Sequence, residues 1–176
     1  MALTPDKSTP FEITLRVVAF NELLGIQTMA QSVWPDYYTP IIGAQQVHYM
    51  LKSFYSLESL QAQFSNQHVF YWIYSHLPEA IGFLSVEQLQ PHQYKIHKFY
   101  LIQSHAQQGI GSLAFNRLRQ ELTAHQIELT VNRFNYKAIN FYFKNGFRIT
   151  SLADFDIGNG FVMNDFIMQW RSSQMG

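Results

Sequence analysis

The sequence predicts a mixed α/β (α+β) fold, in which one mixed sheet is flanked by helices. Segments with the two-residue period of strands alternate along the chain with segments of helical period. The turn Leu77-Pro78-Glu79-Ala80 lies between two apolar strand segments and predicts a hairpin. With 176 residues, of which 47% are hydrophobic and 16% aromatic, the chain is long and apolar enough for one domain over residues 1–176.

Strands are expected where apolar and polar residues alternate, or where β-branched and aromatic residues cluster. In the first such segment, residues 11–17, the alternation is that of a half-buried strand. The other expected strands are residues 68–74, 80–86, 93–102, 127–132, 147–152 and 161–170.

Helices are expected where apolar residues recur every three or four positions. Asn21 is a suitable cap for the first helix, because its side chain can accept from the free N–H groups of the first turn. The expected helices are residues 21–29, 44–54, 56–64, 109–124 and 135–145. Pro35 and Pro40 bound the aromatic segment WPDYYTP, which is expected to be a loop between the first two helices.

The composition argues against several classes of protein. Twelve basic and twelve acidic residues give zero formal net charge, whereas a nucleic-acid-binding protein needs a basic excess. There is no cysteine for disulfides or zinc–thiolate sites, and the seven histidines lack ligand spacing such as HExxH, so no metal is expected. The sequence starts without a signal-peptide pattern, and no apolar run approaches the ~18 residues of a membrane span. A cytoplasmic protein without a membrane partner is therefore expected.

The most informative segment is KIHKFYLIQSHAQQGIGS, residues 95–112, in which a strand pattern leads through a polar loop into a helix. The first N–H groups of a helix have no partner within it, and the helix dipole adds partial positive charge there. Gly109 and Gly111 let an anion approach this backbone, and Ser112 can add a hydroxyl donor. The segment predicts a phosphate site, although an ordinary strand-to-helix turn has the same pattern.

A second motif, NYKAINFYFKNGF, follows at residues 135–147. Together the two segments closely resemble the GNAT superfamily of N-acetyltransferases. In that family an Arg/Gln-x-x-Gly-x-Gly/Ala loop is followed by a strand and an Asn-x-x-Ala-x-x-Phe/Leu-Tyr-x-x-x-Gly-Phe helix. The resemblance covers residues 68–170 well and the first 67 residues more loosely. Ala106 departs from it, because the family usually has Arg or Gln at that position.

The resemblance implies a GNAT-like, mostly antiparallel sheet with splayed middle strands, and acetyl-coenzyme A (acetyl-CoA) as the acetyl donor. The loop would hold the pyrophosphate through backbone N–H groups, and the pantetheine arm would bond to the strand before it. Asn135 would contact the coenzyme, and it is equally suited to cap its helix. The implied donor-binding residues are Tyr100, Leu101, Gln103, Gln107, Gln108, Gly109, Ile110, Gly111, Ser112, Asn135, Ala138 and Tyr142.

The resemblance also implies that Tyr142 is the general acid that protonates the departing thiolate. Packing against the sheet is the alternative role, since the chain has ten tyrosines. The attacking amine needs a base, for which His97 and Glu87 are candidates; an imidazole has a suitable pKa of about 6.5. A water relay, or a purely structural role for His97, is the alternative.

Trp34, Asp36, Tyr37 and Tyr38 lie where the family generally builds its acceptor site. Aromatic faces attract cationic amines and Asp36 could pair with an ammonium group, although a cap over the core explains the segment equally well. This region resembles bacterial polyamine-type acetyltransferases, which weakly favours a polyamine-like acceptor.

The predicted function is therefore direct transfer of an acetyl group from acetyl-CoA to a primary amine of a small molecule or peptide. No cysteine, and no serine in a recognisable nucleophile setting, is present to form an acyl-enzyme. The alternative is a non-catalytic acyl-CoA-binding or sensor module. A monomer or homodimer is expected.

Overall fold

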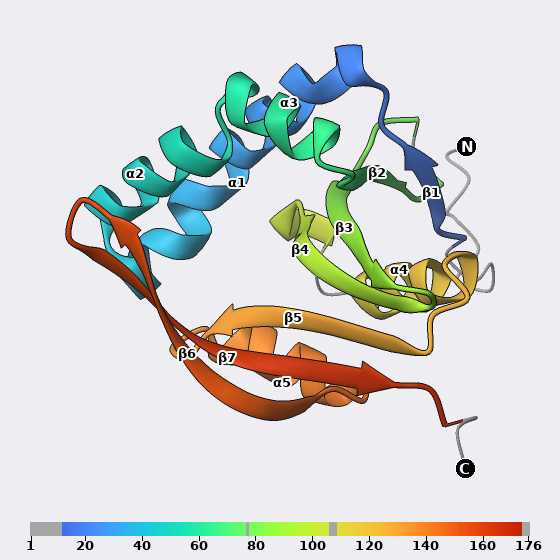
Figure 1. Cartoon of the computed structure of the whole chain (residues 1–176). Helices are drawn as coiled ribbons and strands as arrows, with labels where there is room; N and C mark the ends of the chain where they lie inside the picture. The colour runs from blue at the N-terminus through green and yellow to red at the C-terminus, as the bar shows by residue number, and fades with distance from the viewer. Residues whose placement is uncertain (1–11, 77, 106–108, 174–176) are drawn as a thin grey trace, which may run out of the picture.

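The computed structural model describes residues 12–76, 78–105 and 109–173 (Figure 1). Seven strands form one sheet in the order β1-β2-β3-β4-β5-β7-β6, in which only the β4–β5 pair is parallel. The strands are β1 (Thr14–Val17), β2 (Val69–Tyr74), β3 (Gly82–Gln90), β4 (Gln93–Leu101), β5 (Gln126–Asn132), β6 (Arg148–Gly158) and β7 (Phe161–Arg171).

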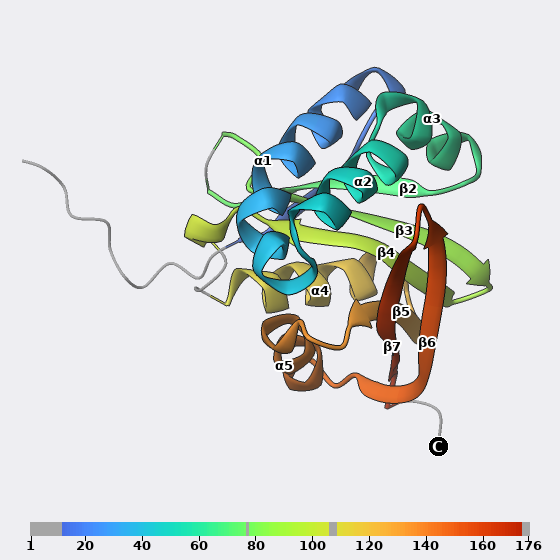
Figure 2. The ribbon, with the colours of Figure 1, turned by 90° about the vertical axis from the view of Figure 1, so that its left-hand side faces the viewer.

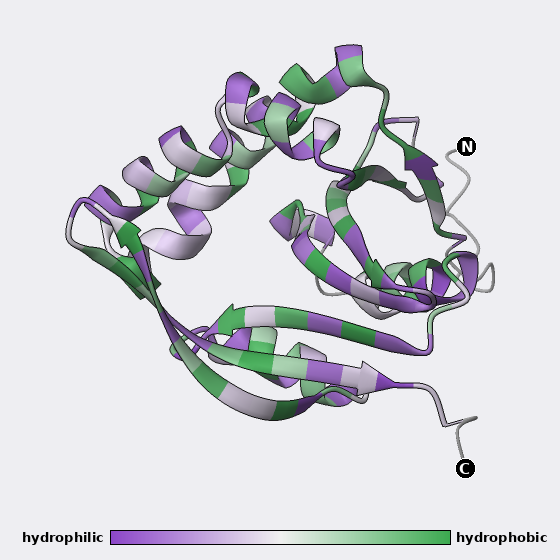
Figure 3. Cartoon of the chain, in the orientation of Figure 1, coloured by the Kyte–Doolittle hydropathy of each residue, from purple (hydrophilic) through white to green (hydrophobic). Residues whose placement is uncertain are grey.

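Helices cover both faces of this sheet, and each face has its own hydrophobic core (Figures 1 and 2). Helices α1, α2 and α3 pack on one face over Phe70, Trp72 and Phe83, and α4 and α5 pack on the other. The alternation of hydropathy along β5, visible in Figure 3, matches its alternation of buried and half-buried residues. The helices are α1 (Leu23–Ile42), α2 (Ala44–Phe54), α3 (Leu57–Ser65), α4 (Ile110–Glu121) and α5 (Tyr136–Lys144).

The sheet opens in its middle. The parallel pairing of β4 with β5 runs only from Gln93–Gln126 to Ile96–Leu129. Beyond that point β4 stays paired with β3 as far as Leu101, and β5 stays paired with β7 as far as Asn132. The two strands therefore diverge, as Figure 1 shows, and the backbone groups that face the opening have no neighbouring strand.

The long β6–β7 hairpin extends from the sheet to α2. The Tyr49 hydroxyl donates to the carbonyl of Ile157, and the Gln46 side-chain amide donates to the carbonyl of Val162. The Tyr49 ring also contacts the Phe161 ring, with 5.2 Å between centroids. These contacts join the hairpin to the helical layer over the first half of the sheet.

The predicted fold class is confirmed, including the mostly antiparallel sheet with diverging middle strands. Three local predictions are wrong. WPDYYTP is the second half of α1 rather than a loop, and β6 continues to Gly158 instead of ending near residue 152. Asn21 does not cap α1, because it lies within a short 3-10 helix (Phe20–Glu22) that precedes it. Proline removes a helix N–H, but here aromatic burial outweighs that loss, because Trp34 packs against Tyr55 and Tyr100 as well as Tyr38 and is only 3% exposed. No helix in the described ranges is both long and apolar enough to cross a membrane.

Trp34→Ala should lower the free energy of unfolding by ~3–5 kcal/mol, because it empties a site that is only 3% exposed. Pro35→Ala, at the neighbouring exposed position, should not lower it, because alanine restores the missing N–H and suits a helix better. Chemical denaturation of both variants checks this expectation. A Trp34→Ala protein as stable as the wild type would contradict it.

Candidate active site

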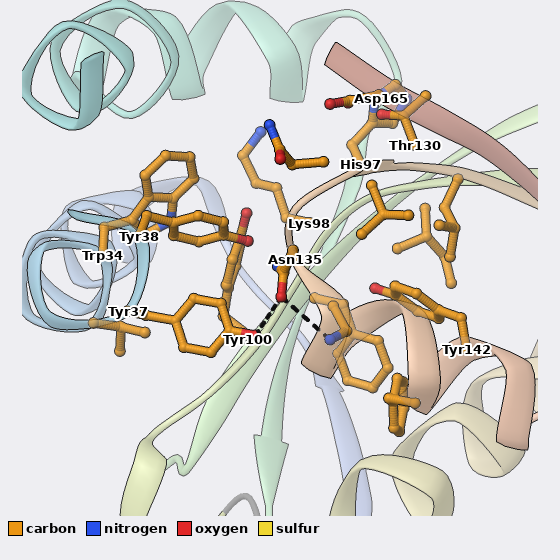
Figure 4. A pocket seen from close by; sticks show the side chains of 18 of the residues that line it. Trp34, Tyr37, Tyr38, His97, Lys98, Tyr100, Thr130, Asn135, Tyr142 and Asp165 are labelled. Carbon is orange, nitrogen blue, oxygen red and sulfur yellow. Dashed lines mark hydrogen bonds between the residues drawn. The ribbon is translucent and has the colours of Figure 1, made fainter. Parts of the chain in front are cut away.

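A cavity of about 1320 Å³ passes through the opening between β4 and β5. Its wall includes residues of both cores, so it connects the layer of α1–α3 with the layer of α5 (Figure 4). Its volume exceeds that of most small-molecule pockets, which suits a long ligand together with a second one. Helix α4 begins at one margin of this cavity, with Gly109, Gly111 and Ser112 in the wall.

The start of α4 has the features of an anion site. Gly109 caps the helix in the left-handed conformation, with φ of 74°, and a Cβ there would meet nothing within 4 Å. Gly109, Gly111 and Ser112 line the cavity, so the first turn of α4 borders its open space, and the free N–H groups of that turn suit a phosphate group. Ala106, Gln107 and Gln108, which the motif places in the same loop, lie outside the described residues.

Gly111 serves packing rather than access to this space. A Cβ at Gly111 would lie 2.9 Å from the Phe141 ring and 3.6 Å from the Leu101 side chain. The second glycine of the motif therefore lets α4 approach α5 and the end of β4. Its replacement by valine would disturb the fold as well as any ligand, because the ring of Phe141 would have to move.

Tyr142 of α5 reaches into the cavity with its hydroxyl (Figure 4). Its ring packs against Phe141 and Phe147, with centroids 5.1 and 5.3 Å away. Burial raises the pKa of the phenol above its ordinary value, so the group keeps its proton at neutral pH. The ring therefore packs as in the structural alternative, and the hydroxyl faces the cavity; the role of Tyr142 as general acid stays a prediction.

Asn135 joins α5 to α1. Its Oδ1 atom accepts a hydrogen bond from the N–H of Ala138 at 3.2 Å, which is the expected N-cap, and a second from the Tyr37 hydroxyl at 2.9 Å. The side chain is only 3% exposed, and its position at the cavity wall comes from these two bonds (Figure 4).

An aromatic cluster forms the wall beneath α1. Trp34 contacts the rings of Tyr38, Tyr55 and Tyr100, with centroids 4.4 to 5.7 Å away. Burial raises the pKa of all three phenols well above the ordinary value, so this wall is uncharged. Three of the four expected acceptor residues, Trp34, Tyr37 and Tyr38, line the cavity. Asp36 is exposed on another side of α1 and is not in the wall.

His97 lies at a β-bulge, because Val86 pairs with Ile96 while the preceding Ser85 pairs with Lys98. Its Nε2 atom lies 2.9 Å from Glu87 Oε2. An ionised carboxylate only accepts, so Nε2 carries the proton and Nδ1 keeps its lone pair. Burial lowers the pKa of His97 below the ordinary value in spite of Glu87, which keeps the ring neutral at pH 7. The two candidate bases thus form one hydrogen-bonded pair.

The His68 ring stacks on His97 at 4.3 Å, and the side chains of His68, Glu87 and His97 have ligand-type atoms within 4.8 Å of one another. No local pattern marks this group, since its members lie on three separate segments of the chain. The two ring planes differ by only 26°, so their in-plane lone pairs do not converge on a point ~2.0 Å from each nitrogen. This geometry favours a stacked hydrogen-bonded group over a metal site.

Sequence reasoning also missed two charged residues in the wall, Lys98 and Asp165, because nothing in their local pattern marks them. Asp165 of β7 is 4% exposed, and burial raises its pKa to about 6, although the Thr130 hydroxyl and Arg133 act in the opposite direction. Lys98 of β4 is 7% exposed, and burial lowers its pKa to about 8. Both lie in the cavity wall, as Figure 4 shows.

Comparisons with known proteins agree with this architecture. A model of the Acetyltransferase (GNAT) family matches residues 26–147, which is more than half of the chain. PaiA N-acetyltransferase from Thermoplasma acidophilum, solved with coenzyme A, is 22% identical, with a TM-score of 0.71 over 92% of this chain and 99% of that chain. Spermidine N-acetyltransferase from Vibrio cholerae, solved with CoA and spermine, is 16% identical, with a TM-score of 0.68 over 92% and 96%. No curated protein matches this chain.

The chain therefore belongs to the GNAT acetyltransferase family. As a member of this family it is an acyl-CoA-dependent N-acyltransferase, and its acetyl donor is acetyl-CoA. The open cap of α4 and the unpaired edge of β4 fit that donor, since they offer backbone N–H groups to its phosphates and to its amide-containing arm.

Asp165→Asn should stabilise the protein at alkaline pH. A carboxyl whose pKa is raised by folding favours the folded state below the pKa of the unfolded chain, and this contribution is lost as the pH rises through about 6. At 1.36 kcal/mol per pKa unit, the variant should exceed the wild type by about 2–3 kcal/mol at pH 8, and by little at pH 4.

Urea denaturation at several pH values measures this difference. Asp36→Asn, which changes an exposed carboxylate on α1, is the matched control and should show no such rise between pH 4 and 8. If the free energy of unfolding varied with pH in the same way for Asp165→Asn and wild type, ionisation of Asp165 would not destabilise the folded protein.

Proposed function

We propose that this enzyme transfers the acetyl group of acetyl-CoA directly to a primary amine of a small molecule or peptide, within the cavity between β4 and β5. The observation that carries this proposal is that one cavity joins the open cap of α4 to an aromatic chamber beneath α1, with Tyr142 in its wall. Donor and acceptor can then enter from different faces of the sheet and meet at the opening.

The donor would be held mainly by backbone groups. The start of α4, with Gly109, Ile110, Gly111 and Ser112, would bind its phosphates together with the loop residues Gln107 and Gln108. The free edge of β4 near Tyr100 and Leu101, followed by Gln103, would bind the pantetheine amides. Asn135 and Ala138 border the same space, although the Oδ1 atom of Asn135 is already used by its two hydrogen bonds.

Tyr142 would act as the general acid. Its phenol is protonated at neutral pH, opens into the cavity and has no hydrogen-bond partner among the described residues. A proton held there is available to the thiolate that leaves when the amine nitrogen forms its bond to the acetyl carbon.

His97 would act as the base, and Glu87 would position it. A neutral imidazole with Nε2–H bound to Glu87 presents its Nδ1 lone pair to a proton from the ammonium group of the acceptor. The carboxylate fixes both the tautomer and the orientation of the ring, which is the usual role of such a partner.

A polyamine is the acceptor that the resemblance favours, and the Vibrio cholerae structure with spermine supports it by analogy. The neutral aromatic wall also suits a cationic amine. Asp36, which was expected to pair with an ammonium group, lies outside the cavity and therefore supplies no negative charge for a polyamine there. The cytoplasmic location and the monomeric or homodimeric state remain predictions from the sequence.

Tyr142→Phe should lower kcat by ~10²–10⁴-fold with little change in the affinity for acetyl-CoA, because only the proton is removed. Free-thiol release over a panel of polyamines, amino acids, aminoglycosides and peptide N-termini measures the rate. Tyr136→Phe, on the same helix but 66% exposed, is the control and should be unaffected. Wild-type binding of acetyl-CoA without turnover of any amine would instead favour the sensor module.

His97→Gln should lower kcat/KM and remove the acidic limb of its pH profile, because that limb reports protonation of the base. Glu87→Gln should shift the limb to lower pH, since the bond to Glu87 raises the pKa of His97. His48→Gln, an exposed histidine of α2, controls for nonspecific effects. An unchanged acidic limb in His97→Gln would assign the base to another group or to water.

A further inference from the structure

Lys98 is a buried cation whose hydrogen-bond acceptor is a neutral side chain. Its Nζ atom donates to the neutral Oε1 of Gln63 at 2.6 Å and lies 4.9 Å from the centre of the Tyr55 ring. No ion pair to Lys98 occurs among the described residues, and Glu87 on the neighbouring strand is bonded to His97. Buried charges are ordinarily paired, so a lysine in this environment needs an explanation.

The cavity as a whole has a surplus of positive charge. Among the described residues, the wall contains four lysines, Lys95, Lys98, Lys137 and Lys144, and one carboxyl, that of Asp165. Lys137 and Lys144 belong to α5, whereas Lys98 contacts Gln63 of α3 and the rings of Tyr55 and Phe70. This surplus is unfavourable for a polycation, and on the side of α1–α3 it favours an anion.

The position of Lys98 separates it from the phosphate site. Along β4, Phe99 and Leu101 pack into the core beneath α4 and α5, whereas Lys98 and Tyr100 face the opposite layer. The phosphates of coenzyme A are expected at the cap of α4, on the side of the first group. An anion at Lys98 would therefore belong to the acceptor and not to the donor.

We propose that the acceptor carries a carboxylate as well as its primary amine, as a free amino acid or a short peptide does, and that Lys98 binds this carboxylate. This inference rests on the proposed acetyl transfer and names the substrate class of the same cavity. An incoming carboxylate would complete the missing ion pair in a buried aromatic setting, where charge-assisted hydrogen bonds are strong. The neutral partner Gln63 can remain bonded to the same ammonium group, which has three N–H donors.

The remaining charged groups fit the other end of such a molecule. Asp165, which interacts with the Thr130 hydroxyl, and His97 line the same cavity as Lys98 (Figure 4). A carboxyl and a neutral imidazole can hold an ammonium group and accept its proton. One molecule with groups of both signs would thus be oriented by Lys98 at one end and by these two residues at the other.

Isothermal titration of the enzyme saturated with coenzyme A tests this proposal without requiring turnover. The probes are free amino acids and dipeptides, each compared with its C-terminal amide and its decarboxylated amine, together with spermidine. At least one carboxylate should bind about tenfold or more tightly than its own amide, and more tightly than spermidine. The comparison of amino acids with dipeptides distinguishes the two sources of the carboxylate.

Lys98→Met should abolish the preference for the carboxylate over the amide, because it keeps the volume and removes the charge. Its thermal midpoint should be no lower than that of the wild type, which verifies the fold. Lys52→Met removes the same charge from α2 outside the cavity and should keep the preference.

The proposal is overturned if no carboxylate binds more tightly than its amide, or if the preference survives in Lys98→Met. The transferase function and the role of Lys98 can be refuted separately. Acetylation of amines without any preference for a carboxylate would leave the transferase function intact and refute the role of Lys98. Lys98-dependent binding of amino acids that are never acetylated would refute the proposed transfer instead.

Discussion

The whole site depends on the early end of the pairing between β4 and β5. The two strands are bonded over four residue pairs and then diverge after Ile96 and Leu129, while each keeps its outer neighbour. A parallel pair that continued would fill the space of the cavity and use the backbone groups of β4. Contacts on α5 hold the opening in place, because Phe141 packs on Phe99 at 5.8 Å and Asn135 bonds to Tyr37.

The side chains on the two faces of β4 have different roles at the opening. Side chains of β4 that point toward α4 and α5 are apolar and support the start of α4, where Gly111 allows close packing. Those that point toward α1–α3 include Lys98 and Tyr100, which line the chamber beneath α1. The buried charges of Lys98 and Asp165 lower stability, so their presence in the cavity wall is most simply explained by function.

Local patterns in the sequence predicted nearly all strands and helices. The spacing of apolar residues follows the buried face of each element, and turn residues mark where an element ends. The error at WPDYYTP arose because two prolines argue against a helix, while the burial of Trp34 that outweighs them depends on partners far along the chain. The same limit applies to the site. Tyr142 and the loop before α4 could be predicted because they belong to sequence motifs. Lys98, Asp165 and His68 could not, because their roles depend on contacts between segments that are distant in the sequence.

Hydrogen–deuterium exchange with and without coenzyme A tests the central claim most directly, since it follows backbone N–H groups. If the coenzyme binds in the opening, exchange should slow at the start of α4 and in the last residues of β4, and should not change in the β6–β7 hairpin near α2. Unchanged exchange in β4 and α4, with protection elsewhere, would show that the coenzyme does not bind in the opening of the sheet.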